Sequence, residues 1–276
     1  MGRRRQITVV AVAGIALVAG GVAAAVPITT VGPDAPGAGG TGPALPSASA
    51  PPALPVVVTD CWVPTDAGSI ALTLDDAKAL TTVAAAATIP ARREGRLLAA
   101  VERRLDVTPE QAVLVTRRLL GSRSTSRLTC SPPRLGVEPE DAGPSGLTPR
   151  ARRLRAAWTA AFGPLVAGGF ARGGVSSGHV DSSSHYEGRA IDVFFRPLGD
   201  AEQRRRGRVF AQWLVAHAQD YSVLSIIYAD QIWTSWAAYA GWREYVHPSG
   251  DRANAVLRHL DHVHVAVESG RPYRRP

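Results

Sequence analysis

Apolar residues follow different patterns along the chain, and these patterns divide the sequence into segments. The first is an apolar run from Ile7 to Val26 that contains no charged residue, and three arginines at positions 3–5 precede it. A basic stretch followed by such a run is typical of an export signal or of a single membrane span. We therefore expect residues 1–26 to be a signal peptide or a signal anchor, and the remainder of the chain to be exported in either case.

The next segments differ in whether they show helical spacing. Residues 27–59 are rich in Pro, Gly, Ala and Ser and lack periodicity, which predicts a flexible linker. Residues 60–132 show helical spacing interrupted by Pro90 and Gly121, which predicts a small helical segment. The helices expected there cover residues 73–88, 92–105 and 108–120. Residues 133–146 again lack periodicity and are interpreted as a second linker.

The last segment, residues 147–276, alternates between helix-like and strand-like patterns. The expected helices cover residues 147–163 and 199–219, and the expected strands cover residues 165–171, 189–195, 223–233 and 262–267. A loop rich in Gly and Ser, residues 173–184, lies between the first two strands. Few strands among long helices predict an α+β fold, with a small antiparallel or mixed sheet and flanking helices.

The net charge of the chain excludes few classes of binding partner. There are 31 basic and 23 acidic residues, a net charge of +8, which could attract nucleic acid, an anionic membrane or the anionic polymers of a bacterial envelope. The run Arg204-Arg205-Arg206 is more typical of a solvated helix face than of a binding site. Nucleic acid is not expected as a partner, because the chain has no nucleic-acid motif and is expected to be exported.

Two cysteines, Cys61 and Cys130, agree with export. An even number of thiols in an oxidising compartment tends to form disulfides, so we expect these two to pair, with two unpaired buried thiols as the alternative.

Candidate chemistry is concentrated in two places. His185 and Asp192 lie seven positions apart where the loop 173–184 leads into an apolar strand, and a carboxylate buried in that strand requires a positive partner. His259, Asp261, His262 and His264 lie within six residues near the end of the chain. Strand alternation puts His262 and His264 on the same face. Two imidazoles and one carboxylate around an open position are a standard ligand set for catalytic zinc.

At these residues the chain resembles a known family. The pattern Ser-x-His-x-x-Gly-x-Ala-x-Asp, followed later by His-x-His, resembles the D-Ala-D-Ala carboxypeptidase group of zinc peptidases, in the superfamily shared with lysostaphin-type endopeptidases and the hedgehog signalling domain. The resemblance covers about the last 130 residues. The matching positions are Ser183, His185, Gly188, Ala190 and Asp192. It implies a zinc metallopeptidase that hydrolyses peptide bonds in peptidoglycan stem peptides, as a carboxypeptidase or an endopeptidase.

The resemblance also implies roles for individual residues. It makes His185, Asp192 and His264 the zinc ligands. Carboxypeptidases of this group carry a Glu three residues before the last ligand, and this chain has the shorter Asp261 there. Strand alternation turns Asp261 away from His264, unless the strand begins or bulges at that point, but puts His262 on the correct face. Other branches use the first histidine of His-x-His. We therefore favour His262 as the base or transition-state stabiliser, with Asp261 second.

Other positions are candidates for contacts with the substrate. The resemblance implies that Arg172 faces the substrate, where it could bind a carboxylate or stabilise an oxyanion, although a solvated loop arginine would look the same. It also implies that Ser183 binds substrate or orients His185. An aromatic stretch, residues 233–242, is interpreted mainly as packing, with the alternative that part of it lines a substrate cleft. The alternative to a peptidase is a weakly active or inactive protein of this fold that binds the cell wall or a partner, which the Asp at position 261 keeps open.

Overall fold

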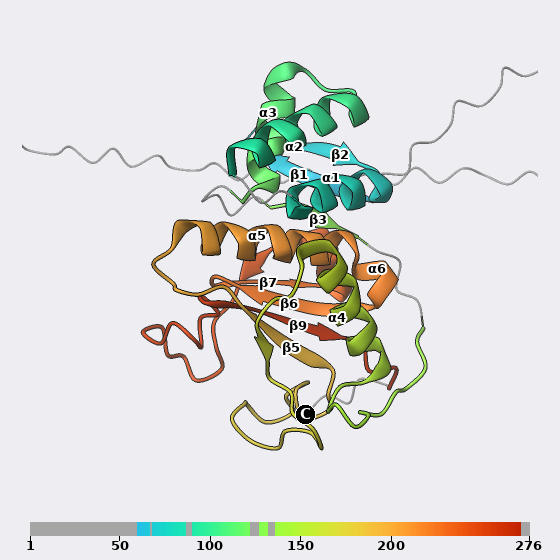
Figure 1. The fold of residues 1–276 in the computed structure, drawn as a ribbon, viewed down its shortest axis with the longest axis vertical. Helices are drawn as coiled ribbons and strands as arrows, with labels where there is room; N and C mark the ends of the chain where they lie inside the picture. Colours follow the sequence, from blue (N-terminus) through green and yellow to red (C-terminus); the bar gives the residue numbers. More distant parts are fainter. Residues whose placement is uncertain (1–59, 67, 87–89, 122–126, 132–135, 272–276) are drawn as a thin grey trace, which may run out of the picture. The chain divides into compact units, whose positions relative to one another are not determined.

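Two antiparallel sheets and the helices packed on them make up the fold (Figure 1). The computed structural model describes residues 60–66, 68–86, 90–121, 127–131 and 136–271. These residues belong to one unit, Leu54–Pro276. The expected export signal and first linker, residues 1–59, lie outside the described residues. Among the helices that are described, none combines the length and the apolar character needed to span a membrane.

The first sheet has three strands in the order β2-β1-β3. Cys61, at the start of β1, lies opposite Cys130 in β3, and the two are joined by a disulfide. The sequence patterns pointed only to helices in this part of the chain, because strands this short show too little alternation to be recognised. The strands are β1 (Cys61–Thr65), β2 (Gly68–Leu72) and β3 (Thr129–Cys130).

Three helices follow β2, close to the ranges expected from the sequence: α1 (Leu74–Ala86), α2 (Pro90–Arg104) and α3 (Pro109–Leu119). Their starts are encoded locally. Thr108 forms a capping box with Gln111 at the start of α3, and the hydroxyl oxygen of Thr73 accepts a hydrogen bond from the Asp76 N–H in the first turn of α1.

The second sheet has six strands in the order β4-β5-β9-β6-β7-β8, and every neighbouring pair is antiparallel. Its strands are β4 (Ala167–Gly168), β5 (Ala190–Phe194), β6 (Val223–Tyr228), β7 (Gln231–Thr234), β8 (Arg243–Glu244) and β9 (His262–Val267). The helices of this half are α4 (Pro149–Phe162), α5 (Ala201–Ala216), α6 (Ala218–Tyr221) and the short 3-10 helix η1 (Ser235–Ala240). The α+β prediction, with an antiparallel sheet and flanking helices, is confirmed.

Two strand predictions were wrong in detail. The strand expected over residues 165–171 shrinks to the two residues of β4. The strand expected over residues 223–233 is a hairpin, because the chain reverses at Ala229 and Asp230, both of which have positive φ angles of 52° and 60°. Such a turn suits a two-residue hairpin, but neither residue is a glycine, the residue that would have indicated a hairpin turn in the sequence.

Helix α5 joins the two halves of the described chain. The residue before its first turn is Asp200, whose side chain accepts hydrogen bonds from the N–H groups of Glu202 and Gln203. Its buried face supplies large apolar residues such as Phe210 to one continuous core. On the same helix, the side chain of the fully buried Gln212 accepts a hydrogen bond from the Leu128 N–H and donates one to the Leu119 carbonyl oxygen. The segment 60–131 therefore packs on α5 through both apolar and polar contacts.

Candidate metal centre

Strands β5 and β9 present three polar side chains on one face of the large sheet. Asp192 in β5 lies directly opposite His264 in β9, and Phe194 lies opposite His262. Because side chains alternate along a strand, His262 and His264 share the face that carries Asp192. This arrangement is the one that strand alternation predicted for the two histidines.

His185 reaches the same face from the turn before β5. The turn is closed by hydrogen bonds from the Gly188 N–H to the His185 carbonyl and from the Arg189 N–H to the Ser184 carbonyl. Gly188 has a φ angle of 64°, and a Cβ atom there would overlap the backbone oxygen of Gly146. A glycine is therefore required at the position where the sequence pattern has it.

Three potential ligand atoms converge at this point. His185 Nε2 lies 3.1 Å from His264 Nδ1 and 3.4 Å from Asp192 Oδ1, and His264 Nδ1 lies 3.0 Å from Asp192 Oδ1. Ligands about 2.0–2.1 Å from a tetrahedral zinc ion are separated from one another by about 3.3 Å. The three side chains therefore fit a small cation bound between them.

The tautomer of His185 also favours a cation between the three side chains. Its Nδ1 lies 2.7 Å from the carbonyl oxygen of Gly169, and a carbonyl can only accept, so Nδ1 carries the proton and Nε2 presents a lone pair. That lone pair faces a carboxylate oxygen and a second imidazole. The single proton on His264 Nδ1 can serve only one of these contacts, whereas a cation satisfies all three. A Cβ atom at Gly169 would clash with the His185 ring, so the missing side chain makes room for it.

The charge states also suit a metal ion. Asp192 is buried, which alone would raise its pKa, but the interactions with His185 and His264 hold the pKa of this carboxyl well below its usual range. Burial lowers the pKa of His264. An ionised carboxylate and a neutral imidazole are the forms that bind metal ions.

The structure adds His179, which the sequence patterns did not single out. The ligand atoms of His179, His185 and Asp192 all lie within 4.8 Å of one another, so this cluster could also hold a metal ion. However, the His179 ring stacks on the His185 ring at 3.9 Å and 16°. The lone pairs of an imidazole lie in its plane, so two nearly parallel rings point past the same ion. His264 is better oriented than His179 as the third ligand.

The backbone of His179 is fixed by Tyr186. The hydroxyl group of Tyr186 accepts a hydrogen bond from the His179 N–H and donates one to its carbonyl oxygen. His179 lies in the loop 173–184, which has no periodicity from which its position could be read.

A second pair of side chains lies next to the three candidate ligands. His262 Nδ1 is 2.8 Å from Asp261 Oδ1, and His262 Nε2 faces Asp192 Oδ1 at 3.9 Å. The other oxygen of Asp261 accepts a hydrogen bond from Arg196 Nε at 2.7 Å and forms an ion pair with a terminal nitrogen of Arg196, also at 2.7 Å. Burial would raise the pKa of Asp261, but its hydrogen bonds with His262 and Arg196 lower it.

It follows that Asp261 and His262 have different roles in this geometry. Both carboxylate oxygens of Asp261 are engaged, one by His262 and one by Arg196. An ionised Asp261 accepts the proton on His262 Nδ1, so Nε2 presents a lone pair toward the candidate ligands. His262 can therefore take up a proton there, while Asp261 fixes its tautomer. Arg196 was not recognised from the sequence, because its contact with Asp261 spans 65 residues.

His259 extends the cluster further. Its ring lies 4.6 Å from the ring of His262 and packs edge-on against Tyr245. Burial, together with the nearby His264 and His262, lowers the pKa of His259 to about 3, so its imidazole is neutral. Its φ angle of 53° is uncommon for a residue other than glycine and marks a strained position beside the site.

The remaining predicted residues lie further from these contacts. The hydroxyl oxygen of Ser183 accepts a hydrogen bond from the His185 N–H, so Ser183 fixes the backbone rather than the ring. Arg172 is exposed in the turn after β4 and has no hydrogen bond or ion pair within the described ranges. In the aromatic stretch, Trp233 is fully buried, whereas Trp236 and Tyr239 are exposed on η1.

Comparison with known protein families shows a similarity over part of the chain. The family model described as VldE, C-terminal domain, matches residues 143–256, so the chain is similar to that family over these residues. The matched range includes His179, His185 and Asp192 and ends before β9. No curated protein and no solved structure matches the chain.

Proposed function

We propose that the protein is a zinc-dependent peptidase, with His185, Asp192 and His264 as metal ligands. The observation that carries this proposal is the mutual approach of His185 Nε2, Asp192 Oδ1 and His264 Nδ1 at 3.0–3.4 Å, beside a histidine that a carboxylate orients. Two imidazole nitrogens and one carboxylate oxygen suit zinc better than magnesium or calcium, which prefer oxygen ligands. When bound, zinc would act as a Lewis acid toward water and a peptide carbonyl.

The proton transfers are assigned to His262. Its Nε2 takes a proton from the attacking water as the water oxygen bonds to the peptide carbonyl carbon. The same nitrogen then gives this proton to the departing amine as the C–N bond breaks, which leaves a carboxylic acid and an amine; the acid then passes its remaining proton to the amine or to water. Asp261 accepts the hydrogen bond from Nδ1 and stabilises the charged imidazole between the two steps.

Arg196 and Ser183 position other residues of the site. Arg196 binds the second oxygen of Asp261 and so fixes the carboxylate plane that aligns His262. Ser183 fixes the backbone of His185. Arg172 is exposed in the turn after β4, before the candidate ligand His185 in the chain. We propose that it binds the substrate carboxylate or stabilises an oxyanion.

We propose peptidoglycan stem peptides as the substrate. The support is the sequence pattern from Ser183 to Asp192, together with the apolar N-terminal run that predicts export to the compartment of the cell wall. The protein would be secreted or anchored by one span in the membrane. The Cys61–Cys130 disulfide is compatible with that location.

The test combines metal content with activity. We expect the purified full chain to contain one equivalent of zinc by elemental analysis and to release peptides from purified cell walls. His185→Ala and His264→Ala should lose both properties, because each change removes one of three ligands. His247→Ala is the matched control, since His247 is a partly exposed histidine whose ring contacts Ser249 in a loop.

Two other outcomes separate the alternatives. Zinc without peptide release would support the inactive protein that binds the cell wall or a partner. A wild-type protein without bound metal, and variants that behave like it, would refute the metal centre.

A further inference from the structure

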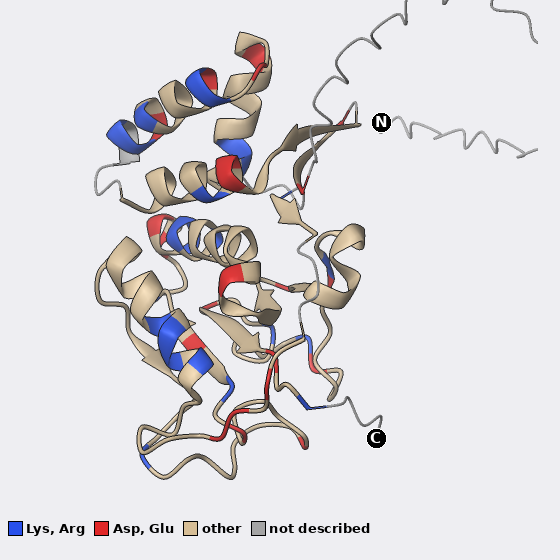
Figure 2. Ribbon diagram, turned by 90° about the vertical axis from the view of Figure 1, so that its right-hand side faces the viewer, with Lys and Arg blue, Asp and Glu red and all other residues tan. Residues whose placement is uncertain are grey.

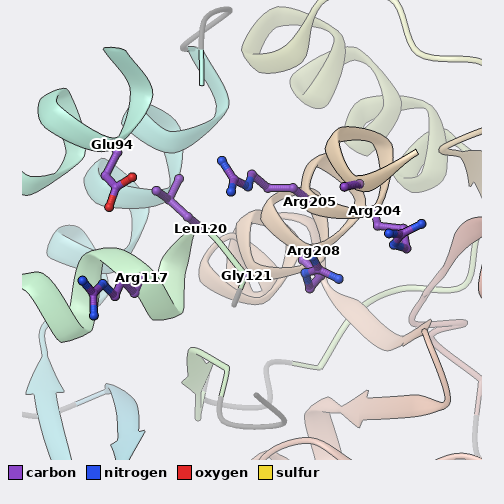
Figure 3. Close-up of a pocket in the computed structure, with 8 residues that line it drawn as sticks. Glu94, Arg117, Leu120, Gly121, Arg204, Arg205 and Arg208 are labelled. Atoms are coloured by element: carbon purple, nitrogen blue, oxygen red, sulfur yellow. The ribbon is translucent and has the colours of Figure 1, made fainter. Parts of the chain in front are cut away.

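A pocket lined by arginines lies away from the histidines, where the first turns of α5 meet α2 and the end of α3. It has a volume of about 310 Å³. Figure 3 shows its lining, and Figure 2 shows basic residues on α2, α4 and α5, while the strands of the large sheet are mostly uncharged. The charged lining residues are Arg117, Arg204, Arg205, Arg208 and Glu94.

The pocket has an excess of positive charge. Among the described residues that line it, Glu94 is the only acid, against four arginines. The two acids at the start of α5 are not among the described lining residues: Asp200 caps the helix, and Glu202 forms an ion pair with Arg93. Four arginines that line one small space give it a positive potential, which an anion in the pocket would offset.

Two of the arginines have no competing acidic partner. The side chains of Arg117 and Arg205 form no ion pair or hydrogen bond within the described part of the chain, and Figure 3 shows Arg205 extending toward Leu120 and Glu94. Arg204 is held differently, by donating to the Leu198 carbonyl. The guanidinium groups of Arg117 and Arg205 therefore remain able to bind a ligand.

The backbone around the pocket is adapted to the arginines. Arg204, Arg205 and Arg208 fall on neighbouring turns of α5 at spacings of three and four residues, which places them along one side of the helix. Gly121 ends α3 with a φ angle of 74°, and a Cβ atom there would clash with the Arg208 side chain. A residue other than glycine would displace Arg208 from the pocket wall.

We propose that this pocket binds a phosphate group. Guanidinium groups form paired, charge-assisted hydrogen bonds with phosphate oxygens, and several arginines around one space are typical of phosphate recognition. The space is large enough for a phosphate with a short organic substituent. The phosphate could be a free ion or part of a phosphodiester in a lipid headgroup, and both present the same oxygens. This site does not depend on the metal centre.

Binding to the full chain is measured by titration calorimetry at low and high salt. The probes are inorganic phosphate and the soluble short-chain lipid dihexanoyl phosphatidylglycerol. We expect saturable binding to the wild type and a Kd at least about tenfold higher in Arg117→Gln/Arg205→Gln, because two charge-assisted contacts are lost. The probe that binds more tightly identifies the free ion or the headgroup as the source.

The control removes the same charge elsewhere. Arg103→Gln/Arg152→Gln changes two exposed arginines outside the pocket, and it should leave the Kd within about twofold of the wild-type value. Circular dichroism checks that both double variants remain folded. Equal weakening in the two double variants would show that binding follows net charge alone and would overturn the site. Failure of the wild type to bind either probe would also overturn it.

Discussion

The Asp261→Asn substitution tests the assignment of His262 as the base. Asp261 Oδ2 accepts a hydrogen bond from Arg196 Nε and forms an ion pair with its terminal nitrogen, and Oδ1 accepts the proton of His262 Nδ1. An asparagine has one oxygen and one NH2 group. The charged Arg196 offers two donors, so the oxygen should turn toward Arg196 and the NH2 group toward His262. His262 Nδ1 must then accept, its proton moves to Nε2, and the lone pair needed for the base is lost.

The expected effect is large on rate and small on stability. A catalytic histidine in the wrong tautomer lowers kcat by roughly 10³–10⁴-fold, which corresponds to about 4–5.5 kcal/mol of transition-state stabilisation. The pair with Arg196 contributes at most about 1 kcal/mol to folding, because half of the Arg196 side chain is exposed to solvent. The variant should therefore remain folded and should retain its metal.

The assay measures peptide release from cell walls together with bound zinc and the melting temperature. Asp230→Asn is the matched control, since Asp230 also forms a two-bond pair with an arginine, Arg258, but lies in the β6–β7 turn. A rate for Asp261→Asn within about tenfold of wild type, with normal zinc content, would refute the assigned tautomer. Loss of zinc in this variant would instead mean that Asp261 supports the metal ligands.

Two further predictions concern stability. Replacing both cysteines (Cys61→Ala/Cys130→Ala) should lower the free energy of unfolding by about 4 kcal/mol, because the disulfide closes a loop of 69 residues; urea titration of the wild type and the variant measures this, and equal midpoints would contradict it. With a chelator present, the wild type should lose roughly 3 kcal/mol more than His259→Asn between pH 7 and pH 4. The reason is that the pKa of His259 is lowered to about 3 in the folded protein, so below its ordinary pKa the unfolded state takes up a proton that the folded state does not. Parallel curves of unfolding free energy against pH for the two proteins would rule out this contribution.

Local sequence determined the helices and the face of each candidate ligand. Thr108, Thr148 and Asp200 cap helices at the positions where polar residues precede apolar spacing. The alternation in β9 was sufficient to place His262 and His264 on one face, because alternation depends only on strand geometry. The spacing from His185 to Asp192, with Gly188 between them, likewise matched a turn that leads into a strand.

Other features depended on contacts between distant residues, which periodicity does not encode. The strands β1–β3 are too short to alternate visibly, and the β6–β7 reversal uses residues with positive φ that are not glycine. The role of Asp261 could not be decided from its spacing to His264, because it depends on Arg196, 65 residues earlier in the chain. The stacking of His179 on His185 has no sequence signal either. The sequence therefore determined which side chains face the site, whereas tertiary packing decided which of their atoms meet.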